Sequence, residues 1–327
     1  MRLYEDQWIV VTGGAGFIGS GVVRHLNDQG FSNLILVDDL RQGVKWKNLV
    51  GKQYSDIISK DKLFEWLEGR EKEIEAFIHL GACSDTLMRD ADYLVENNYR
   101  YSIRLADYAV KAGIRFIYAS SASTYGDGSE GFVDDSEKLQ TLRPLNMYGY
   151  SKHMVDLWLK QPPDVLNQVV GLKYFNVFGP NEAHKGRMAS PIGWMVTQAQ
   201  RDGTIRLYKS TEPDKYPDGE QCRDFIYVKD VAAVTCAFLR NDAMGLYNVG
   251  RGVAATWNQL ARAVFKAVGR EPRIEYIETP EDLRGQYQNY TCADVTRLHQ
   301  IGLSCPTSLE DAVADYVRNH LLPGKSW

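Results

Sequence analysis

Residues 10–23, VVTGGAGFIGSGVV, decide the fold of this chain. An apolar run leads directly into Gly14, Gly16 and Gly19, which form a GxGxxG pattern at the start of a helix-like segment. The pattern alone is weak, and a glycine-rich turn without a ligand is the alternative. Between a strand and a helix, however, such glycines permit a tight turn and let the backbone approach a pyrophosphate at the helix N-terminus. The stretch therefore predicts a dinucleotide-binding domain.

The first half of the chain alternates short apolar runs with helix-like segments. Strand-like runs cover residues 8–13, 33–39, 75–82, 114–121 and 168–179, and helical patterns cover 17–30, 60–73 and 93–113. Strands that are apolar on both faces require cover on both sides, which is typical of a parallel sheet. The sequence predicts an α/β fold, a Rossmann-type doubly wound parallel sheet with a smaller mixed α/β substrate domain. We expect the dinucleotide-binding domain at 1–175 plus about 224–250, and the substrate-binding domain at about 176–223 and 251–327.

Composition excludes several classes of protein. The 327 residues are 44% hydrophobic, and the formal net charge is −4, so neither nucleic acid nor an anionic membrane is expected as a partner. No apolar run approaches the roughly 18 residues that would span a bilayer. The five cysteines are scattered without a CxxC pair, which argues against disulfides and zinc and favours a cytoplasmic protein. We expect no metal site, since no HExxH occurs and the six histidines are dispersed.

The second apolar run ends at Asp38 and Asp39, and Asp38 lies 19 positions after Gly19. A carboxylate there accepts bonds from the ribose hydroxyls of the adenosine, which favours NAD. Arg41 and Lys45 follow closely, and either could neutralise the 2′-phosphate of NADP. The residues therefore leave the choice between NADP and NAD open. We also expect Asp56 and Ile57 to follow the third strand, near the adenine.

A catalytic pair is predicted from NMYGYSKHMVDLWLK, residues 146–160. Tyr148 and Lys152 lie four residues apart and share one face of a helix. An ammonium beside a phenol favours the phenolate and lowers its pKa, which makes tyrosine a usable base. Upstream, Ser121 closes a strand with a hydroxyl that could hold the substrate oxygen. This set indicates removal of a proton by tyrosinate and of a hydride by nicotinamide, whereas an ordinary surface pair is the alternative.

Several motifs together resemble the extended short-chain dehydrogenase/reductase superfamily, and within it the nucleotide-sugar epimerases. These motifs are VTGGAGFIGS (11–20), HLGACSDT (79–86), ENNYRYS (96–102), YASSASTYG (118–126), PLNMYGYSK (144–152), KYFNVFGPNEAHKGRMAS (173–190), RDFIYVKDV (223–231) and LRGQYQNYT (283–291). The GACS and HKGRMAS segments resemble most closely the ADP-heptose 6-epimerases. The overlapping spacing Gly13, Gly16, Gly19 is also similar to that of short-chain dehydrogenases.

The resemblance implies a homo-oligomer that holds NADP tightly and interconverts ADP-heptose epimers at C6, for lipopolysaccharide core heptose. It implies Tyr148 and Lys185 as acid/bases and Lys152 on the nicotinamide ribose; by itself, Lys185 is typical of a solvated loop charge. Substrate contacts are implied at Ser121, Asn176, Arg187, Trp194, Tyr208, Arg223 and Tyr287. Cofactor contacts are expected at Gly13, Gly16, Phe17, Ile18, Gly19, Asp38, Asp39, Lys45, Lys60, Leu80, Gly81, Ala82, Cys83, Ser84, Asn97, Lys152 and Val177.

The chain departs from the family pattern at three places. Arg187 stands where the family commonly has serine, Trp194 stands where a histidine is expected, and the charged loop between Tyr208 and Arg223 is longer than usual. Alternatives are a UDP-hexose 4-epimerase, a 4,6-dehydratase, a net reductase and a dinucleotide-sensing regulator. The SSASTYG stretch lacks the acidic pair of dehydratases, and regulators on this fold tend to lose the tyrosine and lysine pair that this chain keeps.

Overall fold

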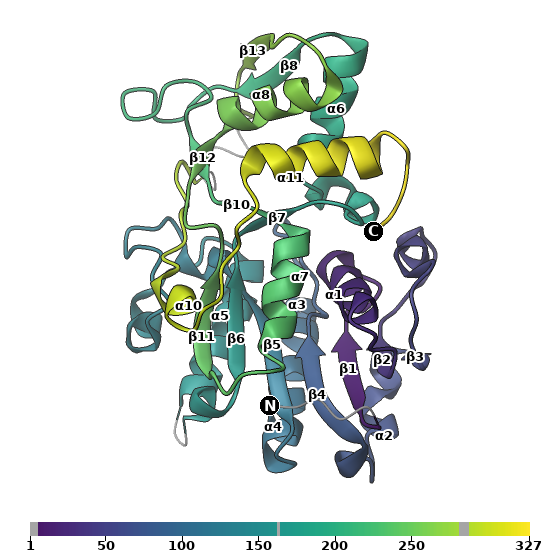
Figure 1. Cartoon of the computed structure of the whole chain (residues 1–327). Coiled ribbons are helices and arrows are strands. Elements are labelled where there is room, and N and C mark those ends of the chain that lie inside the picture. Colours follow the sequence, from purple (N-terminus) through teal and green to yellow (C-terminus); the bar gives the residue numbers. More distant parts are fainter. Residues whose placement is uncertain (1–5, 162–163, 281–287) are drawn as a thin grey trace.

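A seven-stranded sheet forms the centre of the molecule, with the strand order β11-β6-β5-β4-β1-β2-β3 and every neighbouring pair parallel (Figure 1). The structure is a computed structural model, and it describes residues 6–161, 164–280 and 288–327. The chain order along the sheet reverses between β1 and β4, which places a crevice at their carboxyl ends. The predicted doubly wound fold is thereby confirmed.

The strands of the large sheet are β1 (Trp8–Thr12), β2 (Leu34–Val37), β3 (Asp56–Ile58), β4 (Ile74–His79), β5 (Arg115–Ser121), β6 (Val170–Tyr174) and β11 (Gly245–Val249). Three two-stranded sheets contain β7 (Asn176–Phe178), β8 (Ile205–Tyr208), β9 (Cys222–Arg223), β10 (Phe225–Tyr227), β12 (Ala255–Thr256) and β13 (Ile274–Ile277). The α-helices are α1 (Phe17–Asp28), α2 (Leu63–Trp66), α3 (Ala91–Leu94), α4 (Tyr101–Lys111), α5 (Met147–Lys160), α6 (Ile192–Arg201), α7 (Val228–Ala237), α8 (Trp257–Val268), α10 (Thr296–Gln300) and α11 (Leu309–Asp315).

Helices cover both faces of the large sheet, as its apolar strands require. α1 packs against α7 on one face, and α4 and α5 pack against each other and against β5 on the other (Figure 1). The side chains of β2 and β4 are buried along the whole length of each strand. None of the described helices is both long and apolar enough to cross a bilayer.

A second hydrophobic cluster lies above the carboxyl ends of the large sheet. α6, α8, α11 and β8 supply most of it, and Ile274 of β13 packs against it, at the top of Figure 1. The high amphipathicity of α8 explains its place: its apolar side chains pack against α6 and α11, and a capping box between Thr256 and Gln259 fixes its first turn. The division into two domains at the predicted boundaries remains a proposal.

Four predictions about the helices and strands differ from what is observed. The predicted helix 60–73 is α-helical only in the four-residue α2, which lies between two short 3-10 helices, Lys60–Lys62 and Glu71–Glu73. Gly69, with φ of 73°, turns the chain between α2 and the second of them. The predicted strand 168–179 divides at Phe175 into β6 and β7, and β7 pairs with β10 in a separate sheet. Asp56 and Ile57 belong to β3 itself instead of following a strand. The predicted helix 93–113 contains a π-helical segment, Val95–Arg100, between α3 and α4.

Candidate active site

The glycine-rich turn between β1 and α1 is as closely packed as its sequence suggests. Gly13 has φ of 68°, and a Cβ atom there would lie 2.8 Å from the backbone of Gly81 on the neighbouring strand end. A Cβ at Gly19 would lie 2.0 Å from the carbonyl oxygen of Gly13. Gly16 caps α1 without a side-chain hydrogen bond, so no side chain blocks the N-terminus of this helix. The residues fit a pyrophosphate, because such a turn leaves backbone N–H groups available to phosphate oxygens.

Replacing Gly19 by alanine is expected to damage this turn. The new methyl group meets a backbone oxygen that cannot rotate away, and overpacking of this kind typically costs about 1–3 kcal/mol. We expect weaker dinucleotide binding and a lower free energy of unfolding, measured by calorimetric titration and urea denaturation. Gly193→Ala is the control, because no atom lies within 4 Å of a Cβ at that helical position. Equal dinucleotide affinity in both variants would contradict the role given to the turn.

Two adjoining pockets continue from this turn, one on each side of Gly13 and Gly81. The first is lined by Thr12, Gly13, Val37, Asp38, Asp39, Arg41, Lys45, Lys60, Gly81, Ala82, Cys83, Tyr93, Asn97 and Tyr101. The second is lined by Gly13, Gly16, Phe17, Ile18, Gly19, Asp38, Lys45, Leu80, Gly81, Ala82, Ser84, Ala119, Ser120, Ser121, Tyr148, Lys152, Tyr174, Phe175, Val177, His184 and Lys185. Every residue predicted to bind the cofactor, and each of the four predicted catalytic residues, thus lines one of the two pockets. Asp56 and Ile57 line neither of them.

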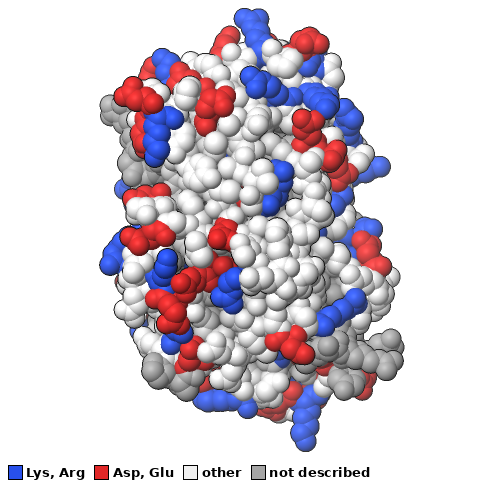
Figure 2. Space-filling view, turned by 60° about the vertical axis from the view of Figure 1, so that its left-hand side comes forward, with Lys and Arg blue, Asp and Glu red and all other residues white. Residues whose placement is uncertain are grey.

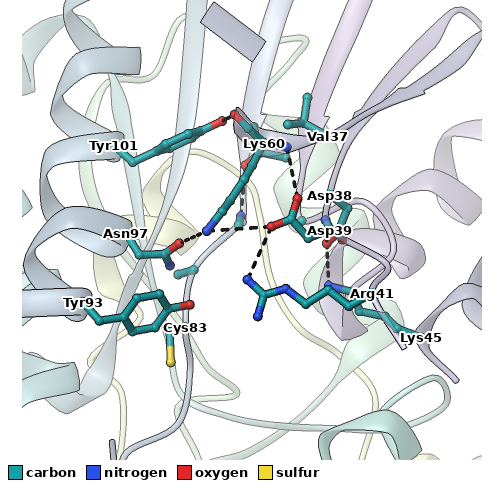
Figure 3. A pocket seen from close by; sticks show the side chains of 14 residues that line it. Val37, Asp38, Asp39, Arg41, Lys45, Lys60, Cys83, Tyr93, Asn97 and Tyr101 are labelled. Atoms are coloured by element: carbon teal, nitrogen blue, oxygen red, sulfur yellow. Dashed lines mark hydrogen bonds and ion pairs between the residues drawn. The ribbon is translucent and has the colours of Figure 1, made fainter. Parts of the chain in front are cut away.

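In the first pocket, basic side chains surround two acidic ones (Figure 3). Lys45 Nζ lies 2.5 Å from one carboxylate oxygen of Asp38. The other carboxylate oxygen of Asp38 accepts a hydrogen bond from the N–H of Ala15 in the turn. Asp39 lies 3.8 Å from Lys60 Nζ and 3.8 Å from the Arg41 guanidinium. This end of the crevice therefore offers carboxylates that could accept ribose hydroxyls, with three cations beside them.

In the second pocket, Tyr148 and Lys152 project from α5 beside the end of β5. Lys152 is 4% exposed, and its Nζ donates to the carbonyl of Ala119 at 2.8 Å. Burial lowers the pKa of Lys152 to about 8. Burial also raises the pKa of Tyr148, and the Ser121 hydroxyl offsets part of that rise. The expected lowering of the pKa of Tyr148 is therefore not found in this arrangement, because loss of hydration outweighs the hydrogen bond with Ser121.

Lys185 reaches the second pocket from a loop that follows β7. Its Nζ lies 5.4 Å from the centre of the Phe17 ring, at the first residue of α1. Burial is the main cause that lowers the pKa of Lys185, and the nearby Glu182 carboxylate opposes it. Gly186, with φ of 53°, turns the chain directly after Lys185. Lys185 is therefore a partly buried lysine at the pocket wall, and its pKa lies nearer to neutrality than that of a solvated loop lysine.

The predicted substrate residues are more widely distributed. Ser121 lines the second pocket, whereas Asn176, Arg187, Trp194, Tyr208 and Arg223 line neither pocket. Asn176 opens β7 next to the pocket residue Val177, and Arg223 is 7% exposed with its guanidinium over Trp257. Arg187 makes an ion pair of 2.9 Å with Asp85, which lies directly after the pocket residue Ser84. Tyr287 lies outside the described residues.

A buried hydrogen-bond chain behind the crevice was not predicted as part of the site. Thr12 Oγ1 lies 2.7 Å from His79 Nδ1, His79 Nε2 lies 2.8 Å from Ser102 Oγ, and Ser102 donates to the carbonyl of Asn98. Burial lowers the pKa of His79 to about 3, so the imidazole is neutral at pH 7. Thr12 also accepts the N–H of Gly81, which ties this chain to the glycine turn. No sequence motif indicates these pairings, because their partners lie far apart in the chain.

His184 is a further pocket residue that sequence reasoning did not select. Its Nδ1 lies 2.9 Å from the carbonyl oxygen of Asn181, so this nitrogen is the donor. The second ring nitrogen is then an acceptor on the side of the ring away from Asn181. Burial lowers the pKa of His184, and Lys45 and Lys185 add to the effect. The sequence signal that could have identified His184 is its position directly before Lys185 in the HKG motif.

Other chemistries have little support in the described part of the chain. No group of three or more histidine, cysteine or acidic residues there could hold a metal ion. On the face of the molecule shown in Figure 2, basic and acidic side chains alternate without a broad field of one sign. The site is a crevice that combines a glycine-rich turn with a tyrosine, two lysines and a serine.

Comparison with known proteins finds close relatives. The model of the NAD dependent epimerase/dehydratase family matches residues 9–250. The chain is 49% identical over 318 residues to an ADP-L-glycero-D-manno-heptose-6-epimerase of Nitratidesulfovibrio vulgaris, which covers 95% of this chain and 97% of the relative. Among solved structures, the ADP-L-glycero-D-manno-heptose-6-epimerase of Helicobacter pylori is similar with a TM-score of 0.80 and 27% identity, covering 98% of this chain and 99% of that one. A UDP-N-acetylglucosamine 4-epimerase of Methanobrevibacter ruminantium is similar with a TM-score of 0.79 and 26% identity, covering 96% and 98%.

Proposed function

The chain belongs to the NAD dependent epimerase/dehydratase family, and from this membership we propose that it interconverts ADP-D-glycero-D-manno-heptose and ADP-L-glycero-D-manno-heptose at C6. The observation that carries the proposal is 49% identity along nearly the whole chain to a relative of that name. The pocket adds support, because it joins Tyr148, Lys152 and Ser121 to Lys185. The product serves the supply of heptose for the lipopolysaccharide core.

In the proposed reaction, each residue of the pocket has a separate role. A nicotinamide cofactor supplies the chemistry of taking a hydride from C6 and returning it. Tyr148 exchanges the proton of the C6 hydroxyl, and Ser121 holds the same oxygen. Lys152, whose Nζ donates to the carbonyl of Ala119, comes from the same helix as Tyr148 and would hold the ribose of the nicotinamide. Phe175 and Val177 add apolar side chains to the wall of the same pocket.

Inversion at C6 explains why two acid/bases are useful. C6 lies outside the sugar ring, so rotation about C5–C6 turns the intermediate ketone over while the nucleotide stays in place. The oxygen then lies at a different position, and a single tyrosine would have to reach both. Tyr148 comes from α5, whereas Lys185 comes from the loop after β7. We propose that each serves one epimer, and a lysine with a lowered pKa is suited to proton transfer near neutral pH.

The enzyme uses a nicotinamide cofactor, and we propose that this is NADP. The support is the charge of the first pocket, where Arg41, Lys45 and Lys60 accompany Asp38 and Asp39. Three cations beside two carboxylates leave one positive charge for a 2′-phosphate.

Arg41 provides a direct test of this preference. Its φ is 44°, so asparagine is the suitable replacement, since it tolerates this backbone. We expect Arg41→Asn to raise the Kd for NADP about tenfold, as for loss of a hydrogen bond to a charged group, and to leave the Kd for NAD nearly unchanged. Calorimetric titration measures both, with Lys47→Gln as the control for loss of a nearby charge outside the pockets. Tighter binding of NAD than of NADP by the parent protein would contradict the proposal.

The proposed function is tested by mixing the protein with ADP-D-glycero-D-manno-heptose and following the C6 proton by NMR. Conversion to an equilibrium mixture of the two epimers, without net change in absorbance at 340 nm, is expected. A lasting change in absorbance would indicate a net oxidoreductase. Conversion of UDP-hexoses in place of the heptose would favour the second candidate, a sugar 4-epimerase, which the similarity to the archaeal structure supports.

We further propose a homo-oligomer and a cytoplasmic setting. All five cysteines are free, which suits a reducing compartment. Sedimentation of the purified protein at several concentrations measures the assembly state.

A further inference from the structure

The loop that carries Lys185 is tied to the last residue of the sequence. Asn181 has a left-handed backbone with φ of 75° and is 8% exposed. Its side-chain oxygen accepts the N–H of Trp327 at 2.9 Å, and its side-chain nitrogen donates to the carbonyl of Trp327 at 3.0 Å. One amide thus forms a two-point pairing with a main chain 146 residues away.

The same asparagine connects this pairing to α1 and to the pocket. Its side-chain nitrogen also donates to Ser20 Oγ at 3.0 Å, inside the helix that follows the glycine turn. Its own carbonyl accepts bonds from His184 Nδ1 at 2.9 Å and from the side chain of Asn48 at 3.1 Å. Because His184 lies directly before Lys185, these bonds fix the backbone from which Lys185 reaches the pocket.

The Trp327 side chain holds the pairing in place. A Cβ atom added to Gly21 would lie 3.0 Å from the indole, so the ring lies directly against the backbone of α1. Lys229 Nζ lies 5.5 Å from the centre of the ring, on α7, and Lys52 Nζ donates to the Trp327 carbonyl at 2.5 Å. The indole packs against both hydrophobic clusters. A long side chain with this many partners has little freedom to move away.

We propose that Trp327 is a positioning residue, which clamps Asn181 against α1 and thereby sets the loop that presents Lys185 to the substrate. The inference rests on the proposed role of Lys185 as an acid/base. Trp327 lines neither of the two pockets, and it acts through Asn181 and His184. The same contacts join α1, which follows the glycine turn, to the loop that carries Lys185. The helix and the loop are therefore held in a fixed position relative to each other.

Two variants remove the clamp from opposite sides. A chain that ends at Ser326 lacks both the ring and the paired main chain, and Asn181→Gly lacks the amide while keeping a backbone that adopts positive φ. Trp327→Ala removes the ring alone and should have the smaller effect. Leu322→Ala, at a side chain that is 45% exposed, is the control for changes near this end.

The first readout is the loop itself, measured on the protein loaded with NADP. We expect amide hydrogen exchange in residues 181–188 to rise about twofold to tenfold in both variants, as for loss of one hydrogen bond. We also expect the pKa of Lys185, measured by competitive labelling of its amine and mass spectrometry, to rise toward that of a solvated lysine. Combining the two changes should add little to either alone, because they break one pairing.

The second readout is epimerisation. We expect kcat to fall and the acidic limb of its pH profile to move to higher pH, with little change in KM. A parental exchange rate and Lys185 pKa in the shortened chain would overturn the proposal, even if activity or the Tm falls. Additive effects of the two changes would overturn it as well. Absence of any heptose conversion by the parent protein would refute the proposed function, whereas the exchange and labelling results would still decide the clamp.

Discussion

Replacing Tyr148 by phenylalanine is expected to lower kcat for epimerisation by about 10²–10⁴-fold, the usual contribution of one general acid/base. The phenol lies at the pocket wall beside Ser121 and the buried Lys152, and no other hydroxyl on α5 lines that pocket. The ring itself remains in the variant, so its packing is preserved. The measurement is the initial rate of conversion at C6, taken from each pure epimer in turn.

Tyr150 supplies the matched control for this variant. It lies two residues further along the same helix, is 47% exposed and lines neither pocket of the crevice. Tyr150→Phe should leave kcat and KM unchanged. Equal loss in both variants would mean that the helix, and not the phenol at position 148, is responsible.

Lys185→Met completes this prediction, because the two-base proposal gives each group a different epimer. With a 6-keto sugar or an analogous carbonyl substrate and reduced cofactor, each single variant should still form one epimer of the alcohol and lose the other. Loss of the same epimer in both variants would contradict the division of roles. If Lys185→Met equilibrates both epimers at the parental rate, the second base is dispensable and a mechanism with tyrosine alone holds.

Replacing Lys173 by methionine is expected to lower the free energy of unfolding by about 3–5 kcal/mol, the usual cost of breaking a buried ion pair from one side. Lys173 on β6 and Asp156 on α5 are 1% and 0% exposed, and their charged atoms lie 2.7 Å apart. Asp156 also accepts the hydroxyls of Tyr118 and Ser120 on β5. Without the lysine, a buried carboxylate would keep only these two neutral donors.

The pair matters for the site because Asp156 lies one turn after Lys152. The bonds of Asp156 hold α5 against β5 and β6. They therefore help to position Tyr148, on the same helix, at the end of the sheet. Urea denaturation measures the loss, and the exposed pair Lys62–Glu65 gives the control, since Lys62→Met should change stability by less than about 1 kcal/mol. A comparable small change for Lys173→Met would show that the buried pair does not stabilise the fold.

Much of the fold could be predicted because its signals are local. The GxGxxG turn specifies a strand before it and a helix after it, and the fully apolar strands specify a covered parallel sheet. The elements that differ from the prediction depend on contacts with residues far away in the sequence. β6 and β7 follow each other in one strand-like run of the sequence, and only the pairing of β7 with β10 shows that they belong to two sheets. The π-helical segment occurs where Asn98 bonds the backbone of Cys83 and the side chain of Ser151, on other elements.

The candidate site also combines features that local sequence signals predict with features that depend on long-range contacts. Tyr148 and Lys152 could be placed on one face from their spacing, and the cofactor residues from the turn and the strand ends. Arg187 was expected to contact substrate, but its guanidinium pairs with Asp85, 102 residues away. The pKa of Tyr148 was expected to fall beside Lys152, but it rises, because burial in the folded pocket outweighs the hydrogen bond with Ser121. The pKa of a side chain and its choice of partner depend on how deeply it is buried and on what surrounds it in the folded protein. The spacing of residues in the sequence does not give this information.

The alternation of apolar strands with helices, the glycine-rich turn and the spacing of the tyrosine and lysine pair could be predicted from the sequence by itself, because each depends on residues a few positions apart. For Lys185 the residues alone were typical of a solvated loop charge and the resemblance implied an acid/base, and only the tertiary structure shows what holds it at the pocket wall. A loop lysine becomes part of a pocket when distant residues hold its backbone, and here Asn48, Ser20 and Trp327 meet around Asn181 to do so. Those contacts join residues separated by up to 161 positions, and folding alone brings them within hydrogen-bond distance.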